Sequence, residues 1–331
     1  FHSSSSNLDP TDTNRVPDLF VRDLDTGVTS LVTIGPSGQH LTCNCAAPQA
    51  APLSGDGRFV LFSANFGYAA GTQLWLRDRG ADQDGVFDEP GSVTTIGIAM
   101  GEIEGDSLAG IDRVALSNDA RYVAFSAPAG DANYESIGSR IYLHDRAVGT
   151  FTRVDRPLPG SGDVVAYSFG PDFSDNGQLA YTSTAPNLAP GDTDEFSDVF
   201  VYDIATATNT RLQLTHVGTR FVYADGTAIS AEGRFVSFMG YEIDGGGTER
   251  WNVYAIDREL QASFDISVRP DGSRADTAAG SSMSADGSAI AFTGGAPILQ
   301  YSYLNFGVFV ATAVSVTSTV PQVSTDGGVV P

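Results

Sequence analysis

Three short acidic segments have the residue types and the spacing that could bind a metal ion. Each segment reads Asp-x-Asp/Asn-x-x-x-Asp. Hard cations such as calcium need several oxygen ligands close together, and alternate carboxylates in a tight loop converge on one point. We therefore predict calcium as a cofactor. The predicted ligands are Asp12, Asn14 and Asp18 in the first segment, Asp82, Asp84, Asp88 and Glu89 in the second, and Asp192, Asp194 and Asp198 in the third.

The second segment has the strongest pattern of the three. Residues 82–89 resemble the first half of a calcium loop, which supplies ligands at its first and third positions and turns at a nearby glycine. The other two segments follow an identical Asn-Leu-x-Pro run, which begins at Asn7 and at Asn187, so a common repeat alone could explain their likeness. A structural alternative stands beside calcium for all three: the last aspartate caps the start of a strand, and the others form side-chain turns.

The motifs of nucleophilic catalysis are incomplete. Residues 105–108 spell Gly-Asp-Ser-Leu, the signature of the GDSL esterases, but the last histidine is His216 and no Asp-x-x-His follows. A nucleophilic serine needs such a base. His2, His40 and His144 lack metal-ligand spacing, and Gly-x-Ser-x-Gly is absent. We therefore predict that the chain is not an enzyme.

The two cysteines leave two states open. Cys43 and Cys45 stand in a Cys-Asn-Cys run, which matches neither a zinc knuckle nor the Cys-x-x-Cys redox pair. A strained local disulfide and two free thiols are both compatible with this spacing.

Two repeated motifs reveal the elements that must carry these loops. A Ser-x-Asp-Gly-Arg-aromatic segment combines a tight turn with an alternating apolar strand. Its copies occupy residues 54–62, 117–125, 174–181, 230–238 and 284–292. A second motif, of the form Val-Phe-Val-x-Asp, occupies residues 19–24, 74–79, 141–146, 199–204, 253–258 and 308–313. A unit of about four strands over roughly 40 to 60 residues is typical of a β-propeller blade.

Together these motifs resemble the WD-repeat-like blades of TolB-type β-propellers, over essentially the whole chain. The resemblance implies an all-β, six-bladed β-propeller of four-stranded blades in a single domain, residues 1–331. It also implies that the strand before each Asp-Gly turn lines a central channel. The expected blades are residues 321–331 plus 1–49, 50–112, 113–170, 171–226, 227–280 and 281–320.

The C-terminal segment predicts how the ring closes. Residues 324–331 are a further copy of the serine repeat that stops one residue before its terminal aromatic, and Phe1 restores the frame. We therefore expect the two ends of the chain to share one strand in the N-terminal blade. The chain could close on itself, or the segment could pair with a neighbouring copy and generate a filament.

The composition limits the partners. The 18 basic residues are all Arg and face 40 acidic residues, a net charge of −22, so nucleic acid and anionic lipid are repelled. No apolar run reaches the roughly 18 residues of a membrane span, so we expect no membrane insertion. The first residue, Phe1, is expected to be a processed or trimmed end.

Composition and resemblance together give the expected function. Ser/Thr-rich residues 3–6 and 312–319, the missing Lys and the acidic loops favour an extracellular or cell-surface location with an O-linked glycan; the alternative is the periplasm. We expect a non-catalytic structural or interaction module, the repeating subunit of a cell-surface filament or assembly, bound to a partner protein or to other copies of itself. The alternative, implied by the resemblance, is a TolB-like binding module for a protein, peptide or glycan. Trp75 and Trp251 are expected to pack between blades.

Overall fold

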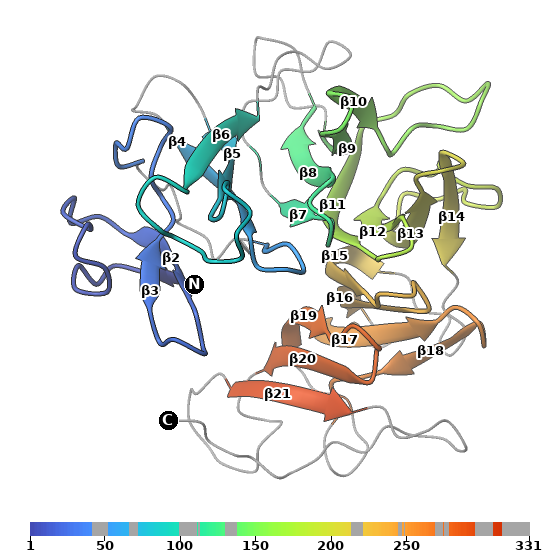
Figure 1. The fold of residues 1–331 in the computed structure, drawn as a ribbon. Coiled ribbons are helices and arrows are strands. Elements are labelled where there is room, and N and C mark those ends of the chain that lie inside the picture. Colours follow the sequence, from blue (N-terminus) through green and yellow to red (C-terminus); the bar gives the residue numbers. More distant parts are fainter. Residues whose placement is uncertain are drawn as a thin grey trace. The chain divides into compact units, whose positions relative to one another are not determined.

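The regular structure is made of β-strands throughout the part of the chain that the structure describes (Figure 1). The computed structural model describes residues 1–41, 52–65, 72–98, 111, 113–129, 138–212, 221–243, 247, 249–268, 274, 278–294 and 307–312. None of these residues forms a helix that could cross a membrane. The chain divides into two compact units, Phe1–Thr152 and Arg153–Pro331.

Unit 1 contains three groups of hydrogen-bonded strands. The first is β1 (His2–Ser3), β2 (Asp18–Arg22) and β3 (Thr29–Leu31), the second is β4 (Phe59–Asn65), β5 (Thr72–Asp78) and β6 (Thr94–Ile98), and the third is β7 (Val114–Leu116), β8 (Tyr122–Pro128), β9 (Gly138–Asp145) and β10 (Thr150–Arg153). Consecutive strands pair antiparallel in the first two groups, and so do β7, β8 and β9.

Unit 2 repeats the same antiparallel pattern. Its strands are β11 (Ala166–Phe173), β12 (Gln178–Ser183), β13 (Asp198–Asp203) and β14 (Thr208–Leu212), then β15 (Phe221–Ile229), β16 (Phe235–Ile243), β17 (Glu249–Asp257) and β18 (Ala262–Asp265), then β19 (Ala278–Met283), β20 (Ala289–Gly294) and β21 (Gly307–Thr312). Strand β11 runs across residues 170 and 171, where the sequence places a boundary between two blades. It pairs along its length with β12.

The Ser-x-Asp-Gly turn is closed by its own side chains. Ser54 Oγ donates to Asp56 Oδ1 at 2.5 Å and accepts the backbone N–H of Phe59 at 2.8 Å. Gly57 has a φ of +75°, a conformation that glycine adopts without strain. The same two serine hydrogen bonds recur at Ser117 and at Ser284. The repeat therefore specifies a tight turn that leads into β4, β8 and β20.

An ion pair explains why the two sequence motifs occur together. Arg58, which ends the turn, pairs with Asp78 at the end of β5 at 2.6 Å and lies over the ring of Phe59, 4.7 Å from its centroid. The equivalent pairs are Arg121 with Asp145 and Arg234 with Asp257. The arginine of one motif thus ties the turn to the aspartate of the other.

Aromatic pairs anchor the core between the second and third strands. Phe125 lies opposite Tyr142 in register and stacks on it, with ring centroids 5.6 Å apart. The equivalent stacked pairs in unit 2 are Tyr181–Phe200, Phe238–Tyr254 and Phe292–Phe309. Such pairs contribute about 0.5–1.5 kcal/mol beyond their buried area.

Phe1 occupies the same place in the first group of strands. It exchanges two backbone hydrogen bonds of 2.8 Å with Phe20, and the two rings stack with centroids 5.8 Å apart. This is the repeat position that the sequence predicts for Phe1. Its ring is 56% exposed, whereas Phe125 is fully buried. The predicted closing segment, residues 321–331, lies outside the described residues.

Candidate metal centres

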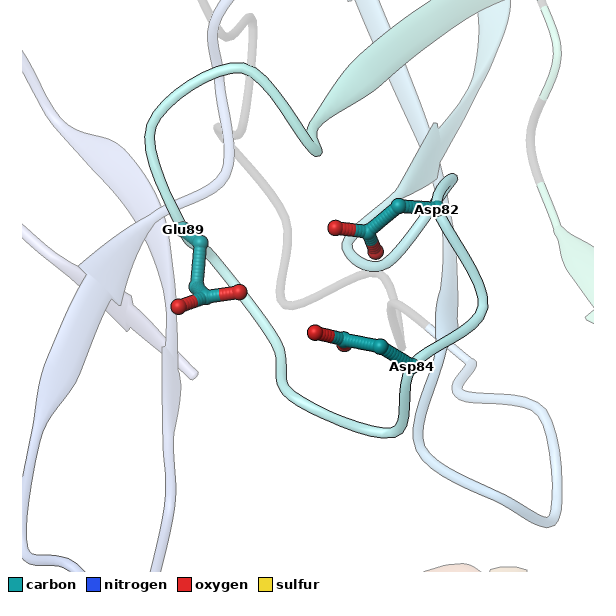
Figure 2. Close-up of side chains that lie close together, drawn as sticks. All are labelled: Asp82, Asp84 and Glu89. Atoms are coloured by element: carbon teal, nitrogen blue, oxygen red, sulfur yellow. The ribbon is translucent and has the colours of Figure 1, made fainter.

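The loop between β5 and β6 gathers three of its four predicted ligands. Carboxylate oxygens of Asp82, Asp84 and Glu89 lie within 4.8 Å of one another (Figure 2). Asp84 Oδ1 accepts the backbone N–H of Val86 at 2.9 Å, and Gly85 turns the loop with a φ of +90°. All three acids are exposed, so water can solvate them without a bound cation.

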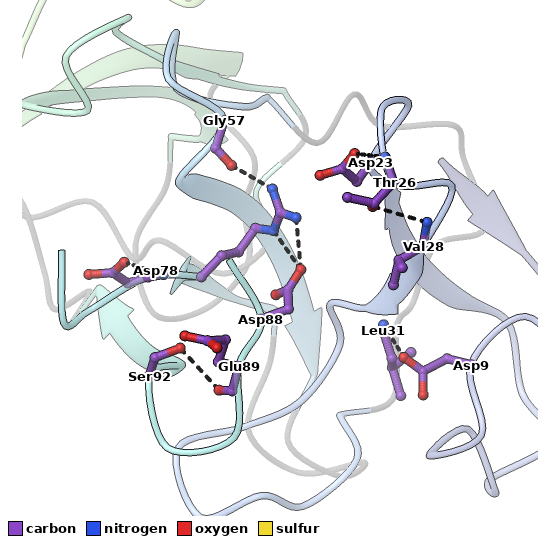
Figure 3. Close-up of polar contacts among 12 residues, drawn as sticks. Asp9, Asp23, Thr26, Val28, Leu31, Gly57, Asp78, Asp88, Glu89 and Ser92 are labelled. Carbon is purple, nitrogen blue, oxygen red and sulfur yellow. Dashed lines mark hydrogen bonds and ion pairs between the residues drawn. The ribbon is translucent and has the colours of Figure 1, made fainter. Parts of the chain in front are cut away.

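The fourth predicted ligand of this loop, Asp88, is held by an arginine. Arg79 donates from Nε and Nη2 to Asp88 Oδ2 at 3.0 and 2.7 Å (Figure 3). Its Nη1 donates to the carbonyl oxygen of Gly57 at 2.7 Å. Asp88 therefore links the loop to the hairpin turn and is not part of the exposed acidic group.

Residues 187–198, which we call loop B, bring all three of their predicted ligands together. Carboxylate oxygens of Asp192, Asp194 and Asp198 lie within 4.8 Å of one another. Asp192 is 5% exposed, and its Oδ1 has no hydrogen-bond partner in the described part of the chain. Burial raises the pKa of Asp192, and burial together with the neighbouring acids raises the pKa of Asp198 to about 6. The site therefore holds negative charge in a poorly solvated place.

One arginine offsets part of this charge. Arg211 on β14 places Nε 2.9 Å from Asp198 Oδ2 and donates from Nη1 to the carbonyl oxygen of Gly191 at 3.2 Å. Arg211 reduces the cost of the buried carboxylate, but Asp192 Oδ1 is left without a donor among the described residues.

Residues 7–18, which we call loop A, fold in the same way as loop B. The backbone N–H of Asp12 donates to the Asp9 carbonyl at 3.1 Å, and the equivalent bond of Asp192 is 3.4 Å. Asn14 Oδ1 accepts the N–H two residues ahead at 3.0 Å, and Asp194 Oδ1 does so at 3.2 Å. The structure therefore builds one loop conformation twice, once in each unit.

Loop A buries two carboxylates, and no arginine of the described residues forms an ion pair with either of them. Asp12 is 6% exposed and Asp18 is fully buried. Thr33 donates its hydroxyl to Asp18 Oδ1, but Asp18 Oδ2 and Asp12 Oδ1 have no hydrogen-bond partner among the described residues. Burial raises the pKa of Asp18, and the charge of Asp12 adds to this effect. His40 lies 3.4 Å from the amide nitrogen of Asn14.

The structure changes the ranking of the three loops. The sequence pattern favours residues 82–89, but the acids gathered there are exposed, whereas loops A and B leave buried carboxylate oxygens without a partner among the described residues. Asp88 Oδ1 is also buried without a partner, but its carboxylate is held by Arg79. The signal that could have identified these two loops is their shared Asn-Leu-x-Pro run. Thr33, which follows β3, and Arg211 on β14 were missed because they have no fixed spacing from the acids.

The other predicted chemical groups are placed as follows. His144 is half-buried, stacks on Phe151 with centroids 4.2 Å apart, and has its pKa lowered by burial. Residues 105–108, His216 and the two cysteines lie outside the described residues.

A row of five aromatic side chains crosses four strands of unit 2, and sequence reasoning did not predict it. The ring centroids of Tyr167, Phe169, Tyr223, Trp251 and Tyr241 follow one another at 6.2, 5.7, 5.8 and 4.8 Å. Tyr167 is 49% exposed, and the other four are partly exposed. Trp75 is buried as expected, with an exposure of 6%, whereas Trp251 was expected to be packed and is partly exposed. We call these five residues the aromatic row.

Comparisons with known proteins identify the fold. No family model and no curated protein matches the sequence. TolB from Acinetobacter baumannii is similar at a TM-score of 0.50 and 14% identity, over 89% of this chain and 57% of TolB. The β-propeller domain of the Trilobed protease from Pyrococcus furiosus, which has an open velcro topology, is similar at a TM-score of 0.51 and 10% identity, over 89% of this chain and 72% of that chain. The chain therefore has a β-propeller fold. A WD-repeat-like family is not confirmed.

The prediction that the chain is not an enzyme is contradicted by further structures of this fold. A puromycin-hydrolysing peptidase from Mycobacterium tuberculosis is similar at a TM-score of 0.51 and 14% identity, over 91% of this chain and 41% of the peptidase. An acylaminoacyl peptidase from Pyrococcus horikoshii is similar at a TM-score of 0.52 and 10% identity, over 89% of this chain and 40% of that chain. Propellers of this kind occur in enzymes, so the missing motifs do not exclude catalysis. The chain spans less than two thirds of TolB and of both peptidases.

Proposed function

We propose that this β-propeller is a binding module and that the aromatic row contacts its partner. The observation that carries this proposal is the row itself, because five adjoining rings remain partly or largely exposed, whereas Phe125–Tyr142, Tyr181–Phe200 and Phe238–Tyr254 are buried pairs. Ile243, exposed by 48%, lies two residues after Tyr241 on β16 and extends the apolar surface on the same face of the strand. Tyrosine and tryptophan are enriched at protein interfaces and at binding hot spots.

A basic peptide segment of a partner protein fits this surface best. The chain carries a net charge of −22, which attracts cations and repels acidic partners. Arginine and lysine side chains bind to the faces of aromatic rings. Tyr223 donates its hydroxyl to Asp225 Oδ2 at 3.2 Å, but Asp225 is itself buried. The exposed aromatic faces and the net charge of the chain therefore favour a cationic ligand over a neutral one.

An array of peptides that differ in net charge, with a glycan array beside it, tests this function. We expect binding to basic peptides, weakened at least about tenfold by Tyr167→Ala and by Trp251→Ala. Val148→Ala, at an exposed position of unit 1, is the matched control and should bind as the parent does. Binding to glycans alone, or binding to basic peptides that neither variant changes, would contradict the proposal.

We also propose that the fold has six blades and that residues 321–331 continue into β1. Three hydrogen bonds between successive turns support this arrangement: Gly55 N to Asn118 O at 2.8 Å, Asp175 N to Ala231 O at 2.8 Å and Ala231 N to Ala285 O at 2.7 Å. Each joins the residue after one repeat serine to its equivalent in the next repeat. Thr325, which follows the serine of the last repeat copy at residue 324, is the next residue at this position.

The segment that precedes β1 in this strand could come from either of two chains. Residues 321–331 of the same chain would give a closed ring, and the same segment of a second copy would link subunits into a filament. The Phe1–Phe20 pair supports both, because it aligns β1 with the second strands of the other groups. We propose an extracellular or cell-surface setting, with the periplasm as the alternative. Ser4, Ser5 and Ser6 are exposed and accessible to O-linked glycosylation.

A further inference from the structure

We propose that loops A and B are two equivalent calcium sites, one in each unit. This inference is independent of the aromatic row and of the proposed binding function. It also differs from the expectation that the sequence pattern favours, in which residues 82–89 are the principal site.

Buried carboxylate oxygens without donors carry the inference. Asp12 and Asp192 are 6% and 5% exposed, and each has an Oδ1 atom without a hydrogen-bond partner in the described part of the chain. Asp18, fully buried, has the same deficit at Oδ2. A buried anion that lacks a partner is strongly destabilising, and native structures normally pair it or bind it to a metal. A cation between the carboxylates would satisfy these oxygens.

The local charge of the two loops supports the same ion. Leu31 on β3 holds the position that Arg211 holds on β14. Leu31 pairs in register with Phe20, and Arg211 pairs in register with the equivalent Phe200. Loop B has a third acid, Asp194, where loop A has Asn14, and it also has the arginine. With their side chains ionised, Asp12 and Asp18 give loop A a charge of −2. The three aspartates of loop B and Arg211 together give loop B the same charge. Asp9, which is also in loop A, uses its Oδ2 to accept the Leu31 N–H (Figure 3).

The donor atoms select calcium among the divalent cations. The motif residues of both loops offer carboxylate and amide oxygens, which hard cations prefer over nitrogen or sulfur ligands. Calcium accepts irregular sets of six to eight oxygens and takes the remaining ligands from backbone carbonyls and water, whereas magnesium demands a near-ideal octahedron. Extracellular calcium modules bind with a Kd of roughly 10⁻⁴–10⁻³ M, and we expect this range here.

Calorimetric titration of the chelated full chain with calcium alone tests the proposal. We expect two calcium ions per chain. Asp18→Asn and Asp198→Asn should each remove one ion, and the double variant should remove both. Asp84→Asn is the matched control, since it changes an exposed acid of the loop at residues 82–89 and should leave two ions bound. Circular dichroism of each variant confirms that it folds.

A second variant keeps the test decisive if an aspartate variant fails to fold. Arg211→Leu gives loop B the apolar residue that loop A has at the equivalent position. It removes a positive charge beside Asp198, so calcium affinity at loop B should rise about tenfold. Loss of calcium binding in Asp84→Asn with two ions retained in Asp18→Asn and Asp198→Asn would overturn the proposal. A parent chain that binds no calcium, with Arg211→Leu unchanged from it, would overturn it as well.

Discussion

At the scale of single residues, burial decides what the acidic side chains do. Asp172 on β11 is an example outside the metal loops. Its Oδ2 accepts the backbone N–H of Ile229 at 2.8 Å, yet burial raises its pKa to about 7. Asp82 and Asp84, in contrast, are exposed and remain hydrated. The free-energy cost of a charged carboxylate therefore differs widely between positions in this chain.

The raised pKa of Asp172 predicts how stability depends on pH. An unfolded aspartate has a pKa of about 3.9, so the folded state binds more protons between about pH 4 and pH 7. The contribution of Asp172 to the free energy of unfolding is therefore highest below pH 4 and falls as the pH rises to 7. We expect a loss of about 2 kcal/mol, less than the full shift implies because the side chain is only half-buried.

Urea unfolding at several pH values measures this effect. Asp172→Asn keeps the hydrogen bond from Ile229 without the charge, so it should flatten the pH profile and stabilise the protein above pH 7. A profile that Asp172→Asn leaves as steep as that of the parent would contradict the account. Asp25→Asn, at an exposed position between β2 and β3, is the matched control.

At the scale of elements, the repeats build hairpins from local interactions, and this is why the sequence predicts them well. The serine turn depends on residues at fixed spacing, and the position of Phe1 follows from the same repeat frame. The arginine–aspartate pair was not predicted, because the separation of its two residues varies from 20 for Arg58–Asp78 to 24 for Arg121–Asp145. The aromatic row and the partners of the acidic loops were not predictable in this way. Arg211 reaches loop B from a different strand, and Trp251 meets Tyr223 across three strands, so only the folded structure brings them together.

The aromatic pairs give a prediction at this scale. Phe125→Ala removes a fully buried ring and should cost about 3–5 kcal/mol of unfolding free energy. Phe1→Ala removes the equivalent ring where it is 56% exposed, and should cost about 1 kcal/mol. Guanidinium unfolding measures both values. Equal losses would show that the first group of strands is packed differently from the others.

At the scale of the whole molecule, the repeats account for a β-propeller, and the comparisons support that fold. The number of blades and the closing strand are proposals that extend the same frame to residues 321–331. The net charge of −22 acts at this scale too, because it favours basic partners and keeps copies of the chain apart at low ionic strength. Calcium would reduce that repulsion when it fills loops A and B.

We propose that one repeat frame runs through the whole chain and that residues 321–331 complete it beside β2. The decisive measurement is the melting temperature of a chain that lacks these residues, with and without a synthetic peptide of the same sequence. We expect truncation to lower the melting temperature and the peptide to restore it, because an open strand edge regains its partner. A scrambled peptide is the control and should restore nothing. A truncated chain as stable as the parent would contradict the claim, whether the ring closes on itself or through a second copy.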